Sequence, residues 1–261
     1  MKLPQLAALV LVIAACAERD QTQDAPAPLV YRRSDVPFAE NPPQPSTDEL
    51  SRSRTIDQLE RLIDEGRDGE ARRQLADYFA KGGSHPRAHL LAGRLASSDG
   101  DDLGAVEHFS RAVAGSSRWI EPRLELAQCF RRLKRSLAAE SVYQDIDHLL
   151  PEAPWGPWGM GLLAWQRGDT ARGLELLDEA LRRDPTHAQS LRARAEIARI
   201  GNDAERERDL LERYLVQRPH DAEAHVRLGD LAVSGNRLVD AERHFRDGWD
   251  LSPQPSTARR L

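Results

Sequence analysis

The sequence predicts an all-α protein in which one helix-turn-helix unit of 34 residues occurs six times in succession. Three features recur in this register: small residues where two helices would cross, bulky residues that would fill the core between them, and residues that end a helix. Units starting at residues 52, 86, 120, 154, 188 and 222 align without an insertion. Such units bury their apolar faces against one another, so the predicted architecture is a solenoid.

Residues 1–15 have the features of a signal peptide. Lys2 gives a positive start, and Leu6–Ala15 is a run of ten apolar residues, too short to cross a bilayer, which needs roughly 20. The segment ends in VIAAC at residues 12–16, which resembles the lipobox of bacterial lipoproteins. The resemblance implies cleavage before Cys16 and lipidation of this cysteine. An ordinary signal peptide followed by a chance cysteine is the alternative.

The charge of the chain gives no indication of nucleic-acid binding. With 37 basic and 42 acidic residues the net charge is −5, and loss of Lys2 with the signal peptide gives 36 − 42 = −6. An acidic chain is not attracted to anionic lipid, so the lipid on Cys16 would itself be the anchor to the membrane. In the lipoproteins that the N-terminus resembles, Asp after the cysteine tends to keep the protein in the inner membrane. Ala17 therefore favours the outer membrane, with the chain facing the periplasm.

Residues 16–50 are rich in proline, which excludes regular helix over most of this segment. We expect an extended, disordered tether. Its one apolar cluster lies in Leu29–Phe38, which is either plain linker or a segment that docks on this protein or a partner. Once Cys16 carries lipid, Cys129 is the only other cysteine, so no disulfide can form within the chain. Cys129 lies in a helical pattern and is expected to be a small buried residue.

Four positions of the 34-residue unit carry the pattern. Positions 8 and 20 are expected to be small because the two helices cross there, position 24 fills the core, and position 32 ends the second helix. Position 8 holds Leu59, Gly93, Ala127, Gly161, Ala195 and Gly229, and position 20 holds Ala71, Ala105, Ala139, Gly173, Glu207 and Ala241. Position 24 holds Leu75, Phe109, Tyr143, Leu177, Leu211 and Phe245, and position 32 is proline in the last four units.

The turn between the two helices is also periodic, and some units depart from the pattern. Gly66, Gly100 and Gly168 share one position with Asn202 and Asn236, and these residue types tolerate the left-handed conformation that ends a helix. The third unit has Lys134 at this position, which leaves its turn less well determined. The fifth unit has Arg194 at position 7 and Glu207 at a position for small residues, and the first unit is the poorest match.

This spacing resembles that of the tetratricopeptide repeat family over residues 51–255, with 256–261 as a tail. The resemblance implies a right-handed superhelix whose concave groove is lined by positions 2, 5, 9, 12 and 13 of the first helices. In the fourth unit these positions hold Trp155, Trp158, Leu162, Trp165 and Gln166. The flanking units contribute Arg131, Arg132, Arg192 and Arg199.

An aromatic strip between guanidinium groups suits an extended peptide that has apolar anchors and a carboxylate. We therefore predict that eight of these residues, namely Trp155, Trp158, Leu162, Trp165 and the four arginines, bind a protein or peptide. The alternatives are that the tryptophans are core residues and that the arginines are solvated, stack on tryptophan, or pair with Glu121 or Glu196. Chaperone-tail recognition is disfavoured, because the asparagine that this family's carboxylate clamp requires is absent from position 9 in all six units.

The sequence contains no pattern typical of catalysis, a cofactor or a metal. The glycines at 156, 159 and 161 lack the Lys-Ser/Thr of a phosphate loop, and neither His85 with His89 nor His220 with His225 has a convincing zinc spacing. We predict a non-enzymatic, lipid-anchored adaptor that helps assemble an envelope complex. The alternatives are a structural oligomer formed through the C-terminal unit near Trp249, which can also pack within its own unit, and an enzyme acting on envelope glycan.

Overall fold

The computed structural model describes the backbone of residues 47–116 and 118–252, and side chains from residue 54 onward. Within these ranges the chain forms helices and no strand. The helices are α2 (Thr47–Asp64), α3 (Asp68–Ala80), α4 (Pro86–Ser98), α5 (Asp102–Gly115), α6 (Ile120–Arg132), α7 (Ser136–Leu149), α8 (Trp155–Gln166), α9 (Thr170–Arg183), α10 (Ala188–Ile200), α11 (Ala204–Gln217), α12 (Ala222–Ser234) and α13 (Leu238–Leu251). The predicted signal peptide, Cys16, the apolar cluster of the tether and the tail lie outside the described residues.

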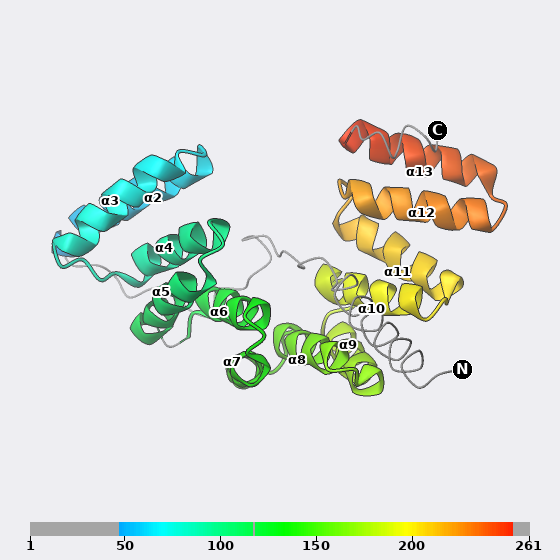
Figure 1. Ribbon diagram of the computed structural model, residues 1–261, viewed down its shortest axis with the longest axis horizontal. Helices are drawn as coiled ribbons and strands as arrows, with labels where there is room; N and C mark the ends of the chain where they lie inside the picture. The colour runs from blue at the N-terminus through cyan, green and yellow to red at the C-terminus, as the bar shows by residue number, and fades with distance from the viewer. Residues whose placement is uncertain (1–46, 117, 253–261) are drawn as a thin grey trace, which may run out of the picture. The chain divides into compact units, whose positions relative to one another are not determined.

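The helices form consecutive pairs, and each helix packs against its neighbours in the chain (Figure 1). The first helices of the second to sixth pairs begin at residues 86, 120, 155, 188 and 222, within one residue of the predicted repeat starts. The predicted all-α solenoid of helix-turn-helix repeats is thereby confirmed. In the first pair, α2 begins at Thr47, before the limit of residue 50 that was predicted for the tether.

The residues at positions 8 and 24 build the core of each pair as predicted. Phe109 and Tyr143 are fully buried, and the other residues of position 24 are also buried. Glycine at position 8 leaves room for the large residue opposite: a Cβ atom at Gly93 would lie 2.5 Å from Cε1 of Phe109, and one at Gly229 would lie 2.3 Å from Cε1 of Phe245. The smallest residue thus faces the largest one, which permits the two helices of a pair to approach closely.

The turn between the helices has the same conformation whether or not it contains glycine. Gly100 has a φ of 80°, and Asn202 and Asn236 have φ values of 55° and 57°. Lys134, at which the turn was least determined from sequence, also adopts a positive φ of 58°. A residue with a long side chain in this region is strained, at about 1–2 kcal/mol. Packing of α6 against α7 therefore holds a turn that the local sequence does not favour.

The departure at position 20 of the fifth repeat is a buried ion pair. Only 2% of Glu207 is exposed, and its two carboxylate oxygens accept hydrogen bonds from Arg227 on α12, from Nε at 2.5 Å and from Nη2 at 2.7 Å. Cys129 on α6 is fully buried, as predicted, and burial raises the pKa of its thiol to about 11. It is a core residue, because a thiol with so high a pKa is not reactive at neutral pH.

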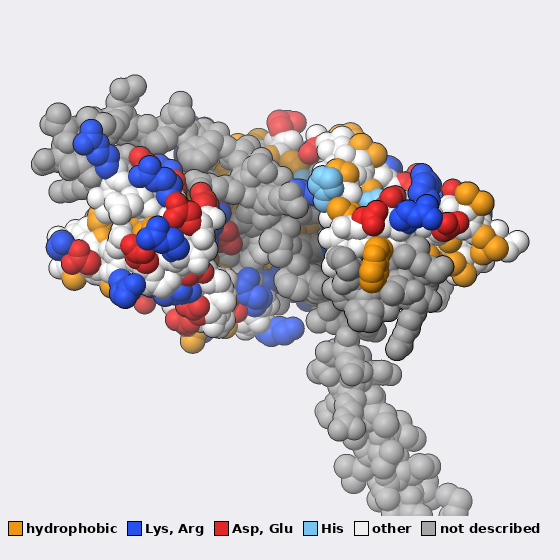
Figure 2. Space-filling view, turned by 90° about the horizontal axis from the view of Figure 1, so that it is seen from above, with side chains coloured by type: hydrophobic (Ala, Val, Ile, Leu, Met, Phe, Trp, Pro, Cys, Tyr) orange, Lys and Arg blue, Asp and Glu red, His pale blue; other side chains and the backbone are white. Residues whose placement is uncertain are grey.

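The visible surface of the described residues carries interspersed charges of both signs (Figure 2). Most of the ion pairs join residues three or four apart on one helix, such as Arg111 with Glu107, or helices of neighbouring repeats, such as Arg87 with Glu60. Exposed pairs of this kind contribute little to stability individually. Among the described residues, no helix is long and apolar enough to cross a membrane.

Candidate functional site

The predicted tryptophan strip lies largely inside the protein. Trp158 is fully buried, and Trp155 and Leu162 are 3% and 1% exposed. The Trp155 and Trp158 rings meet edge to face at 5.9 Å, and Trp155 packs in the same way on His187 at 4.6 Å. The prediction that these three side chains line an open groove is therefore wrong, and the alternative that they belong to the core is correct. Trp165 alone of the four is half-buried.

The composition of α8 explains this burial. Its sequence, WGPWGMGLLAWQ, is apolar on all sides, and a helix of that kind is normally surrounded by protein. It packs against α7 before it, α9 after it, and α10 of the next repeat. The stripe that the family resemblance assigned to a groove is covered here by the neighbouring elements.

Three of the four predicted arginines are engaged by residues of the protein. Arg132 donates to Asp102, at 2.8 Å from Nε, and to the Ser97 hydroxyl at 2.6 Å. Arg199 pairs with Glu196, as one alternative held. Arg131 is half-buried and has no ion pair among the residues that the structure describes. Of the eight predicted residues, three are therefore buried in the core and three are arginines engaged by side chains of the protein.

Arg192 is held by four groups of the next helices. Its guanidinium lies 2.8 Å from carboxylate oxygens of both Asp221 and Glu223, 3.4 Å from the Tyr214 hydroxyl, and 5.9 Å from the centre of the Tyr214 ring. Burial alone would lower its pKa, but Tyr214 and the two carboxylates raise the pKa above its usual value. A guanidinium with these partners has little capacity left for a ligand.

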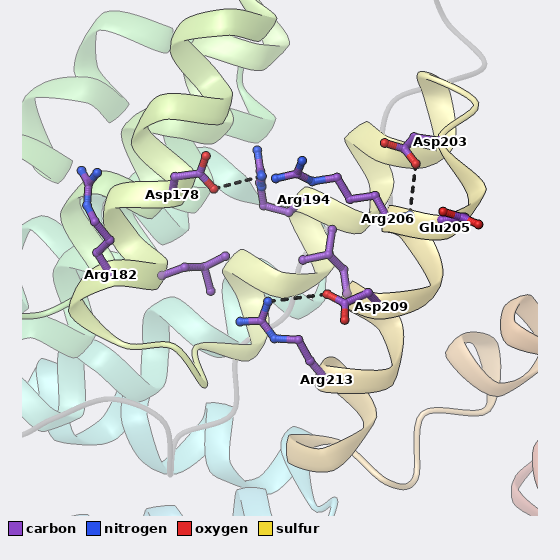
Figure 3. Close-up of a pocket in the computed structure, with 10 residues that line it drawn as sticks. Asp178, Arg182, Arg194, Asp203, Glu205, Arg206, Asp209 and Arg213 are labelled. Atoms are coloured by element: carbon purple, nitrogen blue, oxygen red, sulfur yellow. Dashed lines mark hydrogen bonds and ion pairs between the residues drawn. The ribbon is translucent and has the colours of Figure 1, made fainter.

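A surface pocket of about 580 Å³ lies between α9, α10 and α11 (Figure 3). Helix α9 contributes the Asp178 end of the pocket, α10 contributes Arg194, and α11 forms the opposite wall. The remaining lining residues are Leu181, Arg182, Asp203, Glu205, Arg206, Asp209, Leu210 and Arg213. Four arginines, four acidic residues and two leucines thus share one hollow.

Arg194 occupies an unusual environment for a charged residue. Its position in the repeat is the departure noted in the sequence, and only 5% of the residue is exposed. One nitrogen, Nη2, pairs with Oδ1 of Asp178 at 3.0 Å, whereas the buried Nε has no hydrogen-bond partner. Burial lowers the pKa of Arg194; the Asp178 carboxylate opposes this decrease and the guanidinium of Arg206 adds to it. A buried donor without a partner costs about 1–3 kcal/mol, and more when the group is charged.

Arg206 adds a second guanidinium beside the first. Asp203 begins α11 by accepting a hydrogen bond from the backbone N–H of Arg206 at 3.1 Å, so the first turn of α11 is fixed. The exposed Arg206 side chain extends toward Arg194 in Figure 3. Within the described part of the chain, its guanidinium has no ion-pair partner. Two guanidiniums therefore face one carboxylate, that of Asp178.

The other two arginines of the pocket also have partners within the protein. Arg213 lies 3.8 Å from Asp209 and donates to the carbonyl of Pro185 at 3.3 Å, and Arg182 pairs with Glu179. Arg194, whose Nε has no hydrogen-bond partner among the described residues, and Arg206, which has no ion pair there, are thus the two guanidiniums of the pocket that retain free donors. Such a pair can hold a carboxylate through charge-assisted hydrogen bonds, and the two leucines can contact apolar atoms next to it.

One signal for this pocket is present in the sequence, namely Arg194 at a position that is apolar in most other repeats. Arg206 and Arg213 carried no signal, because arginine is common on exposed helix faces. Their convergence depends on how α11 lies against α9 and α10, and this is visible only in the structure.

Comparison with known proteins supports the repeat assignment. A family model described as tetratricopeptide repeat matches residues 159–222 and 208–254. No curated protein matches the sequence.

Several solved structures have the same fold at low sequence identity. A structure reported for the functional characterisation of Pseudomonas aeruginosa pilF is 16% identical, with a TM-score of 0.62, covering 82% of this chain and 97% of that one. PilW, described as a widely conserved type IV pilus biogenesis factor, is 12% identical, with a TM-score of 0.62 and coverages of 79% and 96%. The Cut9-Hcn1 structure of the APC/C is 16% identical, with a TM-score of 0.62. The match covers 79% of this chain but only 41% of that one.

Proposed function

We propose that this chain, of which residues 159–222 and 208–254 match the tetratricopeptide repeat family model, is a non-enzymatic adaptor that binds a segment of a protein partner. The pocket between α9, α10 and α11 receives an acidic side chain or chain end of that segment. The observation that carries this proposal is the buried Arg194: its Nε has no hydrogen-bond partner among the described residues, and it lies beside Arg206, which has no ion pair among them.

The burial of Arg194 costs free energy that a ligand can offset. A guanidinium removed from water is costly unless charged or polar partners compensate, and Asp178 compensates it only in part. A ligand carboxylate would satisfy Nε of Arg194 and pair with Arg206 at the same time. Leu181 and Leu210 line the same hollow, so an acidic residue with an apolar neighbour fits better than a free inorganic anion.

We further propose that the adaptor is held at a membrane by lipid on Cys16, faces the periplasm from the outer membrane, and assists assembly of an envelope complex. The support is the lipobox-like sequence of residues 12–16, together with the shared fold of PilW, a type IV pilus biogenesis factor. Substitution Cys16→Ser is expected to release the protein from the membrane fraction. Continued membrane association of that variant would contradict lipid anchoring.

Site-specific photo-crosslinking in cells tests the binding site. A photoreactive residue is placed at position 182 on the rim of the pocket, and a second one at 111, an exposed and ion-paired arginine on α5, serves as control. We expect a discrete adduct from 182 that is absent from 111 and is lost when Arg194→Leu is added. An adduct that survives Arg194→Leu would contradict the role of the pocket.

A third probe at Trp165 separates the pocket from the groove that the sequence predicted. Trp165 is the half-buried member of the tryptophan strip and lies on α8, outside the lining of the pocket. An adduct from 165 without one from 182 would transfer the binding site to the groove. This result would support the adaptor function and reject the assignment of the binding site to Arg194.

Self-association remains the second candidate, because α13 exposes apolar residues at its start. Leu238 and Val239 are 63% and 83% exposed, and Trp249, near the other end of α13, is half-buried. If this helix forms an oligomer contact, Trp249→Asp should lower the mass measured by light scattering. A wild-type protein that is monomeric across the accessible concentration range would exclude this candidate.

A further inference from the structure

Three side chains of the last repeat converge at one end of α12 and α13. His225 lies on α12, and His244 and Asp247 lie on α13. The Nδ1 atoms of the two histidines are 3.4 Å apart, and Nδ1 of His225 is 3.8 Å from Oδ2 of Asp247. One ligand atom from each residue lies within 4.8 Å of the other two.

These distances match those between ligands of one metal ion. In a tetrahedral zinc site with bonds of about 2.0–2.1 Å, two ligand atoms lie roughly 3.3 Å apart. The pair of Nδ1 atoms is already at this spacing, and the carboxylate needs only a small rotation to reach it. Two imidazoles and a carboxylate are ligands that zinc accepts, with a fourth position left for water or another group.

The hydrogen bonds around His225 orient it as a ligand. Its Nε2 lies 3.0 Å from the carbonyl oxygen of Pro219. A carbonyl can only accept, so Nε2 carries a proton, and in the neutral ring Nδ1 then presents its lone pair toward His244. A ring N–H bonded to a backbone carbonyl is the usual outer-shell arrangement of a metal-binding histidine.

His244 needs one adjustment. Its Nε2 lies 3.5 Å from a guanidinium nitrogen of Arg243, on the side of the ring away from His225. Coordination through Nδ1 would place the proton of His244 on Nε2, and Arg243 would then turn away. The side chain of Arg243 is 63% exposed, so this movement meets little resistance.

The second repeat provides an internal comparison. His89 and His108 occupy the same two repeat positions as His225 and His244, and their Nδ1 atoms are 3.1 Å apart. The residue that corresponds to Asp247 is Arg111, which pairs with Glu107. Both rings also stack on Phe79, with centroids at 4.7 and 5.5 Å. The repeat geometry thus brings these two positions together in both cases, but only the last repeat adds a carboxylate in place of a cation.

We propose that His225, His244 and Asp247 form a binding site for one divalent transition-metal ion, with zinc as the ion that best fits the ligands. The ion joins α12 to α13 and so fastens the helix pair at the C-terminal side of the array. This assignment differs from the expectation from sequence, which weighed His225 only against His220, a residue that is not a member of the cluster.

The test is a metal titration of the full chain after chelation and dialysis. Zinc is added in competition with a chromophoric chelator, and cobalt is used in parallel because its visible absorption reports the coordination number. We expect one zinc ion per chain and a cobalt spectrum of a site with four or five ligands. His244→Gln and Asp247→Asn should each weaken zinc binding at least about tenfold, since loss of even an outer-shell partner has an effect of that size.

The matched control is His108→Gln, which removes one member of the histidine pair that lacks a carboxylate. It should leave zinc affinity and stoichiometry unchanged. Absence of stoichiometric binding at micromolar zinc, or unchanged affinity in Asp247→Asn, would overturn the proposal. The Asp247 side chain is 48% exposed, so its variant is expected to fold even if a histidine variant does not.

Discussion

Replacement of Arg194 by leucine is expected to stabilise the protein and at the same time to abolish binding at the α9–α11 pocket. Arg194 is 5% exposed. Among the described residues, its Nε has no hydrogen-bond partner and its one ion pair is with Asp178, whose side chain is 48% exposed. After the substitution the half-exposed Asp178 carboxylate can be hydrated, so loss of its partner costs little free energy. Leucine at this position would pack on Leu181 and Leu210, which line the same hollow.

The expected gain in the free energy of unfolding follows from the loss of the buried ion pair and the gain of apolar packing. Exchange of a buried ion pair for well-packed apolar residues is neutral or stabilises by about 1–4 kcal/mol. Because Asp178 is half-exposed and one guanidinium nitrogen already has a partner, we expect about 2 kcal/mol. For a chain of this size, that raises the melting temperature by roughly 4–8 °C.

Thermal and urea unfolding followed by circular dichroism measure the change in stability. The control is Arg206→Leu, the same type of substitution at an exposed position of the same pocket, which should change the stability by less than about 0.5 kcal/mol. A melting temperature of Arg194→Leu below that of the wild type would refute the reasoning. The buried guanidinium would then be a stabilising element and not one retained for a ligand.

Three further predictions concern other departures from the repeat pattern. Arg227→Ala should destabilise the protein by about 3 kcal/mol in urea unfolding, because it leaves the Glu207 carboxylate buried without its partner. Adding Glu207→Ala should restore most of the lost stability. A single variant as stable as the wild type would contradict this. Lys134→Gly should raise the unfolding free energy by about 1 kcal/mol, since glycine relieves the positive φ, and a decrease would show that the lysine is not strained. Burial, assisted by His108 and Arg111, lowers the pKa of His89 from 6.5 to about 4. The free energy of unfolding should therefore fall by at most about 3 kcal/mol as the pH falls from 6.5 to 4. His89→Gln should flatten this part of the stability–pH profile, and an unchanged profile would argue against the shift.

The register of the repeats could be predicted from sequence because it depends on local spacing. A small residue at Gly93 and a large one at Phe109 lie within one helix pair, so their contact follows from the turn that joins the two helices. The environment of Trp158 could not be predicted in this way. It depends on α7 and α10 as well as on its own pair, and a helix that is apolar on all sides gives no periodic signal to separate a groove face from a core face.

Neither of the two proposed sites could be predicted from the sequence alone, because each depends on contacts between helices. The unusual character of Arg194 was visible in the sequence, but its meaning required the placement of Arg206 by the next helix. The histidines of the last repeat are 19 residues apart, at a separation that no short metal motif contains. Comparison of equivalent positions in the second and last repeats would have revealed the pair, and Asp247 in place of Arg111 is the difference that adds a metal ligand.

The buried pair of Glu207 and Arg227 also bears on how the chain avoids folding incorrectly. Six similar units can in principle associate out of order, either within one chain or by exchange between two molecules, since most of their contact faces are alike. If α11 met a first helix other than α12, Glu207 would be buried against a helix without the matching arginine, at a cost of several kcal/mol. An interface that looks like a defect in the repeat pattern thus identifies one neighbour uniquely, and so fixes the order in which the last two repeats assemble.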